Sequence, residues 1–250
     1  MYPAVFRELQ PRLGFAWATR IIAFIALSTL LFSLTVMKRR ISPPMKRRLF
    51  DLNAWREPPF TLFSIGGFIV FLGLYIPFFF ITPFAVLKTG ASEEFAFYFV
   101  PILNAASTLG RIIPNFIADI VGPLNVLFPC TFIAAGLAFC WTMVHDINGL
   151  VTFAVCYGFF SGAFVSLPPA TVASLSPDMK SVGTRMGMSF CLAGFGLLIG
   201  APTGGALLHL RDKLDFFPAQ MFCGAAVAAG AFVMMLARIT KVGLSLTAKA

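Results

Sequence analysis

The sequence predicts an all-α integral membrane protein with about seven transmembrane helices, and three observations support this fold class. Of the 250 residues, 58% are hydrophobic and only 12% are charged, whereas a soluble domain carries about 25% charged residues. The mean hydropathy is +0.87. Several apolar runs also reach the length of about 20 residues that a helix needs to cross a bilayer. Because so few charges cannot cover a water-facing surface, we expect the chain to be surrounded by lipid.

Seven apolar runs follow one another along the chain and predict seven spans. They are residues 14–37, 60–86, 95–117, 124–144, 150–175, 186–208 and 216–237. Short connections between most of them favour antiparallel neighbouring helices. Prolines within or near the spans mark bendable places, because proline removes a backbone hydrogen bond and kinks a helix. They are Pro77, Pro101, Pro114, Pro168-Pro169 and Pro202, and we expect hinges at Pro101, Pro114 and Pro202.

One hydrophilic segment, residues 38–59, separates the first span from the other six. It contains two Lys-Arg-Arg clusters, which are typical of a segment beside anionic lipid headgroups. We therefore expect residues 1–37 to form an outer N-terminal segment and one helix, and residues 38–59 to form a basic cytoplasmic linker. Residues 60–238 would form a six-helix bundle, and residues 239–250 would form a cytoplasmic tail.

The basic residues predict the orientation of the spans. The net charge is +9, with 19 Lys and Arg residues. Thirteen of them fall on the side of the linker, five fall on the other side, and Arg20 lies within a span. Because basic residues gather on the cytoplasmic side, the N-terminus is expected outside and the C-terminus inside. Charges in short clusters between spans also argue against a nucleic-acid partner.

The sequence offers no cluster for catalysis or for metal binding. The five cysteines lie within apolar runs and are too far apart for a metal pair, which favours buried small apolar side chains. The histidines, His145 and His209, have no catalytic partner nearby in the sequence. Phosphate-loop, dinucleotide and zinc motifs are absent as well. We therefore expect no enzymatic activity, no metal and no cofactor.

Six short motifs resemble one transporter family. They are Gly-Phe-Ala-Trp-Ala-Thr-Arg at 14–20, Glu-Pro-Pro-Phe at 57–60, Gly-Arg-Ile-Ile-Pro at 110–114, Ala-Asp-Ile-Val-Gly-Pro-Leu-Asn at 118–125, Gly-Thr-Arg-Met-Gly-Met at 183–188 and Gly-Ala-Pro-Thr-Gly-Gly-Ala-Leu at 200–207. Together they resemble the fungal branch of the monocarboxylate porter-like family in the major facilitator superfamily. The resemblance covers nearly the whole chain.

The resemblance implies a fold of twelve helices in two pseudo-symmetric bundles, of which this chain would hold the equivalents of helices six to twelve. A substrate path would lie between the bundles, so the expected partners are a small-molecule substrate, the lipid bilayer and a missing N-terminal bundle or partner half. The plasma membrane is the expected location.

Arg111 is the strongest candidate for substrate binding, because an ionisable residue inside a span is a functional hypothesis by default. The resemblance implies that an arginine in this helix meets the substrate carboxylate, and a guanidinium suits that role through two parallel hydrogen bonds. The alternative is snorkelling to the cytoplasmic interface, since Arg111 stands late in the predicted span. Arg20 has the same two alternatives at the outer end of the first span.

A polar stripe accompanies Arg111. Asn104, Ser107, Arg111 and Asn115 recur at helical spacing and are expected on one face, where they line a cavity or bond to a neighbouring helix. In some members of the resembled family an aspartate stands four residues before the arginine and couples transport to protons. Ser107 occupies that position here and cannot hold a titratable proton, which weakens a proton-coupled function.

The segment after the third span predicts a gate. Asp119 and Gly122 resemble the second copy of the inner-gate loop motif of major facilitators, and Gly110 belongs to the neighbouring motif. Because a carboxylate there can accept from an arginine, we expect an ion pair between Asp119 and Arg185 on the cytoplasmic side. The alternative is that Asp119 is a static loop cap.

These observations predict a secondary active transporter of a small organic solute, such as a monocarboxylate-like anion. Efflux of a secondary metabolite is a second hypothesis, since Ser107 leaves room for it. A non-transporting seven-span fragment or partner-binding half is a third. A seven-span receptor fits the orientation but not the long basic linker, and a membrane enzyme lacks a catalytic cluster.

Overall fold

The computed structural model describes residues 2–38, 50–208 and 215–243, and every regular element in these ranges is a helix. The chain divides into two units, Met1–Met45 and Lys46–Ala250, and each is described by itself. Within the described ranges, seven helical segments are long and apolar enough to cross a membrane. The predicted fold class and the predicted number of spans are confirmed, and the protein is a multi-pass integral membrane protein.

The first unit is described by one element, α1 (Tyr2–Val36). Its backbone leaves the helical region at Gly14, with φ 77° and ψ 167°, so the element consists of two helical stretches. A positive φ favours glycine because a Cβ would clash with the backbone. The second stretch contains the predicted first span, and the helical stretch before Gly14 is an addition to the prediction.

The second unit contains the other six spans. It begins with a 3-10 helix, η1 (Leu52–Arg56). The spans are α2 (Pro58–Gly73) with α3 (Ile76–Thr89), α4 (Glu93–Ala96) with α5 (Phe99–Val121), α6 (Pro123–Cys140) with the 3-10 helix η2 (Trp141–Met143), α7 (Ile147–Ser166) with α8 (Pro168–Leu175), α9 (Val182–Leu208) and α10 (Phe217–Val242).

Three predicted regions fall wholly or partly outside the described residues. Apart from Lys38, both basic clusters of the linker lie outside them. The linker's last residues, 50–59, are described, and α2 already begins at Pro58. His209 lies outside the described residues as well. The bundle also extends beyond the predicted boundary, because α10 continues to Val242, and the tail from residue 244 onward is not described.

Prolines break the helices at two of the predicted bendable places, Pro77 and Pro168, and not at the predicted hinges. The breaks lie between α2 and α3, where Pro77 stands in the first turn of α3, and between α7 and α8, where Pro168 opens α8. By contrast, α5 runs on through Pro114 and α9 runs on through Pro202. Pro101 stands in the first turn of α5, where the missing N–H has no helical partner to lose.

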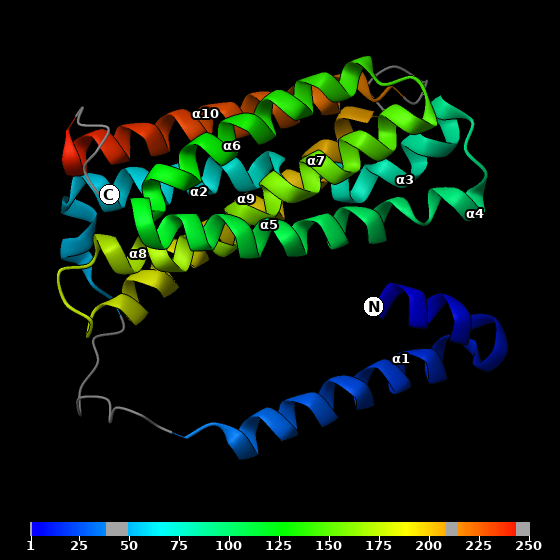
Figure 1. Ribbon diagram of the computed structural model, residues 1–250, viewed down its shortest axis with the longest axis horizontal. Helices are drawn as coiled ribbons and strands as arrows, with labels where there is room; N and C mark the ends of the chain where they lie inside the picture. Colours follow the sequence, from blue (N-terminus) through cyan, green and yellow to red (C-terminus); the bar gives the residue numbers. More distant parts are fainter. Residues whose placement is uncertain (1, 39–49, 209–214, 244–250) are drawn as a thin grey trace. The chain divides into compact units, whose positions relative to one another are not determined.

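The helices of the second unit pack side by side in a defined order (Figure 1). Helix α5 packs on α7, α7 on α6, α6 on α10, α10 on α2, and α2 on α9. Glycines bring several of these pairs close together. A Cβ at Gly196 or Gly200 of α9 would collide with the backbone of α2 at Phe68 and Leu72. Small residues at these two positions therefore allow the backbones of α9 and α2 to approach closely.

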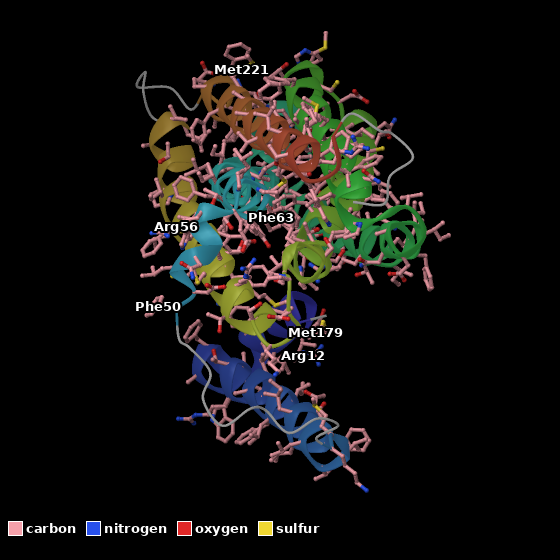
Figure 2. All side chains as sticks on the ribbon, turned by 90° about the vertical axis from the view of Figure 1, so that its left-hand side faces the viewer. Arg12, Phe50, Arg56, Phe63, Met179 and Met221 are labelled. Atoms are coloured by element: carbon pink, nitrogen blue, oxygen red, sulfur yellow. The ribbon has the colours of Figure 1, made fainter. Side chains whose placement is uncertain are left out.

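Large aromatic side chains fill the interior of the second unit. In Figure 2, the buried Phe63 points inward among the helices. Met221, which is 39% exposed, and the exposed Arg56 lie on the outer surface of the unit. Towards one end, the rings of Trp141, Phe153 and Tyr157 stack with centroid separations of 5.3 Å at each step. This apolar interior positions the polar groups described next.

Candidate functional site

An exposed polar line runs along α5 and is the first candidate site. Asn104, Thr108 and Arg111 are exposed and Asn115 is half-buried, and their spacing of three or four residues places them on one face. Asn104 donates to the carbonyl of Val100 at 2.9 Å, and Thr108 donates to the carbonyl of Asn104 at 3.0 Å. The side chains therefore satisfy part of their hydrogen bonding within α5.

Asn115 links this line to a second helix. Its amide nitrogen donates to the carbonyl of Arg111 and, at 3.0 Å, to the hydroxyl of Ser166 at the C-terminal end of α7. Bonding between helices was one of the two interpretations of the polar stripe, and Asn115 shows it. We name Asn104, Thr108, Arg111 and Asn115 the α5 polar line.

Ser107 does not belong to the exposed line that the sequence predicted. It is 3% exposed and faces α7, where a Cβ added to Gly162 would lie 2.9 Å from the Ser107 hydroxyl oxygen. Thr108 occupies the exposed face instead. Gly110, predicted in the gate, is also part of this α5–α7 contact, because a Cβ there would collide with the backbone of Phe159.

Arg111 lies near the middle of α5, in the later part of the span Glu93–Val121. The helix continues to Val121, ten residues further, which at 1.5 Å per residue is about 15 Å. The hydrocarbon core of a bilayer is about 30 Å thick, so a core edge at the end of α5 would place the Cα of Arg111 about half-way through it. Its neighbours Ile112 and Ile113 are 49% and 48% exposed. Substrate contact and snorkelling both stay predictions for Arg111, and no ion pair to it is found within the described ranges.

A second candidate site is built around Arg185 at one end of the bundle. Its side chain is 3% exposed. Nη1 and Nη2 each donate to one oxygen of Glu57 at 2.7 Å, and Nε donates to Asp51 at 3.0 Å. Nη1 also lies 3.4 Å from the carbonyl of Leu175, and the ring of Phe60 lies 5.6 Å from Cζ. We name Arg185, Asp51 and Glu57 the Arg185 clamp.

The clamp corrects the predicted pair between Asp119 and Arg185. All three guanidinium nitrogens donate to Asp51 and Glu57, which lie before α2, whereas Asp119 is exposed near the C-terminal end of α5. The clamp thus joins the start of α2 to the start of α9. Gly122 forms the turn between α5 and α6 with φ 102°, a region that favours glycine. Gating roles for Asp119, Arg185, Gly110 and Gly122 stay predictions.

Further polar contacts lie at the same end of the bundle. Arg238 of α10, 4% exposed, donates from Nε to the side-chain oxygen of Asn125 in α6 at 2.9 Å and from Nη1 to the carbonyl of Gly243 at 3.0 Å. Lys241 donates to the hydroxyl of Ser174 in α8 at 3.2 Å. Together with the Arg185 clamp, these contacts join α2 to α9, α6 to α10 and α8 to α10.

Arg20 belongs to the first unit. Its guanidinium carbon lies 5.1 Å from the centroid of the Trp17 ring, one turn earlier on the exposed surface of α1. A cation above an indole face is an attractive contact. Substrate contact and snorkelling both stay open for Arg20. Across the parts of the chain that the structure describes, no group of three His, Cys, Asp or Glu side chains could hold a metal ion.

Comparisons with known proteins place these features in context. No family model matches the chain. A protein of Emericella nidulans named MFS-type transporter dbaD is 40% identical over 237 residues, covering 95% of this chain and 53% of that protein. The aspyridones efflux protein apdF of the same organism is 34% identical over 227 residues, covering 91% of this chain and 46% of that protein. The chain spans about half the length of the curated relatives it matches.

A solved structure has the same fold. The fucose:proton symporter FucP of E. coli aligns with a TM-score of 0.67, covering 88% of this chain and 54% of the symporter. The sequence identity is 16%, so this likeness concerns the fold alone.

Proposed function

We propose that this chain, which belongs to the major facilitator superfamily, supplies one six-helix bundle and the preceding helix of a secondary transporter for small organic solutes. The second unit would be one of the two bundles between which such a transporter carries its substrate. The relatives that the chain matches are about twice its matched length, which supports a second bundle as its partner. That bundle would come from a longer chain or from a separate partner half.

The position of Arg111 carries this proposal. A cation half-way through a membrane span is costly unless it faces protein or a water-filled cavity. The α5 polar line surrounds Arg111 with an amide and a hydroxyl on the same face, and this face is exposed within the second unit. A substrate path along this face would supply the water and the anion that Arg111 needs.

The same residue suggests the class of substrate. A guanidinium binds a carboxylate through two parallel hydrogen bonds, so we propose an organic acid or a metabolite with an acidic group. A monocarboxylate-like anion fits, and so does a larger secondary metabolite. The similarity to the aspyridones efflux protein supports export as the direction. A non-transporting fragment that binds a partner half is the competing proposal. The plasma membrane is the proposed location, and no enzymatic activity is proposed.

Transport in reconstituted vesicles tests the proposal. The chain would be reconstituted alone, and together with the part of the dbaD relative that lies outside the matched region. Benzoate and its neutral amide, benzamide, would be the labelled solutes. We expect transport of benzoate by the combination, with Arg111→Leu lowering the rate about 10- to 100-fold, because a charge-assisted hydrogen bond is worth about 1.5–3 kcal/mol.

Arg111→Lys and Arg56→Leu complete this experiment. Lysine keeps the charge but loses the planar fork, so Arg111→Lys should retain an intermediate rate. Arg56 is exposed at the end of the bundle, in η1, and its replacement should leave the rate unchanged. If the chain and the added part of the relative co-purify and no benzoate is transported, the proposal is wrong. If the chain transports benzoate alone, the proposal that transport needs a second bundle is wrong.

A further inference from the structure

A cavity lies at the end of the second unit opposite to the Arg185 clamp. It has a volume of about 180 Å³ and is lined by the C-terminal end of α3, by η2 with the residues after it, and by the N-terminal end of α10. At about 30 Å³ per water molecule, it could hold about six waters. No residue of the α5 polar line contributes to it, so it is separate from the proposed substrate path.

Groups of both charges line this cavity, which we name the end pocket. Lys88 from the last turn of α3 is exposed, and Asp215 is half-buried with one carboxylate oxygen accepting from the backbone N–H of Phe217 at 3.1 Å. His145 also lies at the rim. A ligand that carries a single charge would be attracted by one of these groups and repelled by the other.

The inner wall of the end pocket is rigid and aromatic. Phe84 and Phe216 are 4% and 1% exposed, and their rings meet edge to face at 5.2 Å. Gln220 is 3% exposed, and its amide nitrogen lies 3.4 Å from the carbonyl of Trp141. A buried polar side chain and fixed ring faces are features of a preformed pocket.

We propose that the end pocket binds the headgroup of a zwitterionic phospholipid. Lys88 would receive the phosphate, and the ammonium group of the headgroup would lie near Asp215 and the ring of Phe217. An aromatic face and a carboxylate are the usual partners of a quaternary ammonium ion. Both charges of the ligand would then find a partner, which neither a simple anion nor a simple cation achieves.

The location of the end pocket selects a lipid as the source of this zwitterion. The spans Pro58–Thr89 and Pro123–Met143 end beside it, and the span Phe217–Val242 begins there, which is the level of the headgroup region. Two large apolar residues adjoin lining residues in the sequence, namely Leu87 and Met143, which are 55% and 77% exposed. They offer an apolar surface to the acyl chains.

Lipid retention measured by native mass spectrometry tests this proposal. The full chain would be purified from nanodiscs that contain phosphatidylcholine or phosphatidylglycerol, and the number of retained lipids would be counted. We expect the unmodified chain to retain one more phosphatidylcholine than Lys88→Gln or Asp215→Asn. The apparent affinity for this lipid should fall about tenfold in each variant, equal to about 1.4 kcal/mol. Lys180→Gln and Asp178→Asn, exposed charges at the other end of the bundle, should match the unmodified chain.

Three outcomes would overturn the proposal. Equal retention of phosphatidylglycerol would mean that the pocket accepts any anion. Displacement of the lipid by soluble glycerophosphocholine at equal concentration would mean that a free zwitterion, without acyl chains, is the ligand. Unchanged retention in both pocket variants, or an equal loss in the two control variants, would mean that the bound lipid lies elsewhere on the protein.

Discussion

Arg185 is almost completely buried, whereas its carboxylate partners are not. The exposed fractions of the side chains are 3% for Arg185, 23% for Asp51 and 41% for Glu57. A buried charge that loses its partner keeps its desolvation cost, whereas an exposed charge is solvated again. The free energy of unfolding should therefore change by different amounts when the Arg185 cation is removed and when its two carboxylate partners are neutralised.

Neutralising the two carboxylates should destabilise the protein more than removing the arginine. We expect the double variant Asp51→Asn, Glu57→Gln to cost about 3–5 kcal/mol, the usual cost of breaking a buried ion pair on one side. Arg185→Met should cost less, because the freed carboxylates reach the exterior and methionine fills the space. Thermal unfolding in detergent measures both. Glu94→Gln, an exposed acid on α4, is the control, and an equal loss in the two clamp variants would contradict this account.

The partners of Arg185 could not be predicted from the sequence, although Arg185 itself was singled out. Asp51 and Glu57 precede it by 134 and 128 positions, and no local spacing rule relates residues so far apart. Arg111 was predicted because a charge within an apolar run is visible in the sequence. The distance of Arg111 from the end of its span was not predicted, because α5 continues through Pro114 to Val121, beyond the predicted end at residue 117. The exposure of Thr108 in place of Ser107 depends on which face of α5 meets α7.

At the scale of single elements, the backbone contact between α9 and α2 is sensitive to side-chain size. A Cβ at Gly200 would collide with the backbone of Leu72, whereas a Cβ at Gly194 on the same helix would meet nothing within 4 Å. Backbone cannot move aside as the end of a flexible side chain can. The two glycines therefore form a matched pair for testing this packing.

Gly200→Ala should destabilise the protein and Gly194→Ala should not. Inserting a methyl group into a closely packed contact costs about 1–3 kcal/mol, whereas alanine in an open helical position gains up to about 1 kcal/mol over glycine. The two variants should therefore shift the unfolding temperature in opposite directions. Equal shifts would show that α9 and α2 do not approach each other at Gly200.

The break between α2 and α3 is held by a buried tyrosine. The hydroxyl of Tyr157 on α7 donates to the carbonyl of Leu74 at 2.8 Å and lies 3.8 Å from the sulfur of Cys223 on α10. Leu74 immediately follows α2, and Pro77, three residues later, has no N–H for a 3-10 bond to its carbonyl. The tyrosine thus supplies a donor where the helix cannot.

Tyr157→Phe should loosen this break without creating a cavity. We expect a loss of about 0.5–2 kcal/mol, the range for one hydrogen bond inside a membrane protein, and faster hydrogen exchange of the amides around residues 73–78. Tyr98→Phe, at a position that is 53% exposed, serves as the control. Exchange that stays unchanged in Tyr157→Phe would show that the hydroxyl does not hold the break.

At the scale of the whole molecule, the number of spans and the fold class followed from composition and run length alone. Lipid imposes these features, because each backbone polar group in a span must be bonded within its helix. The positions of the helix breaks and the order of packing depend on contacts between spans. These required the structure, because prolines of equal standing in the sequence behave differently: the helices break at Pro77 and Pro168 but run on through Pro114 and Pro202. The end pocket, formed by three separate span ends, had no signal in the sequence.

The central claim is that the α5 polar line faces a water-filled substrate path rather than lipid. Labelling of Thr108→Cys with a membrane-impermeant thiol reagent tests it most directly, in a background in which the five native cysteines are replaced. The assembled transporter should label at this position, and benzoate should slow the reaction, because water and substrate reach this face. Phe132→Cys, at an exposed apolar position of α6, should stay unlabelled. Labelling of Phe132→Cys but not of Thr108→Cys, or labelling of Thr108→Cys that benzoate does not slow, would contradict the account.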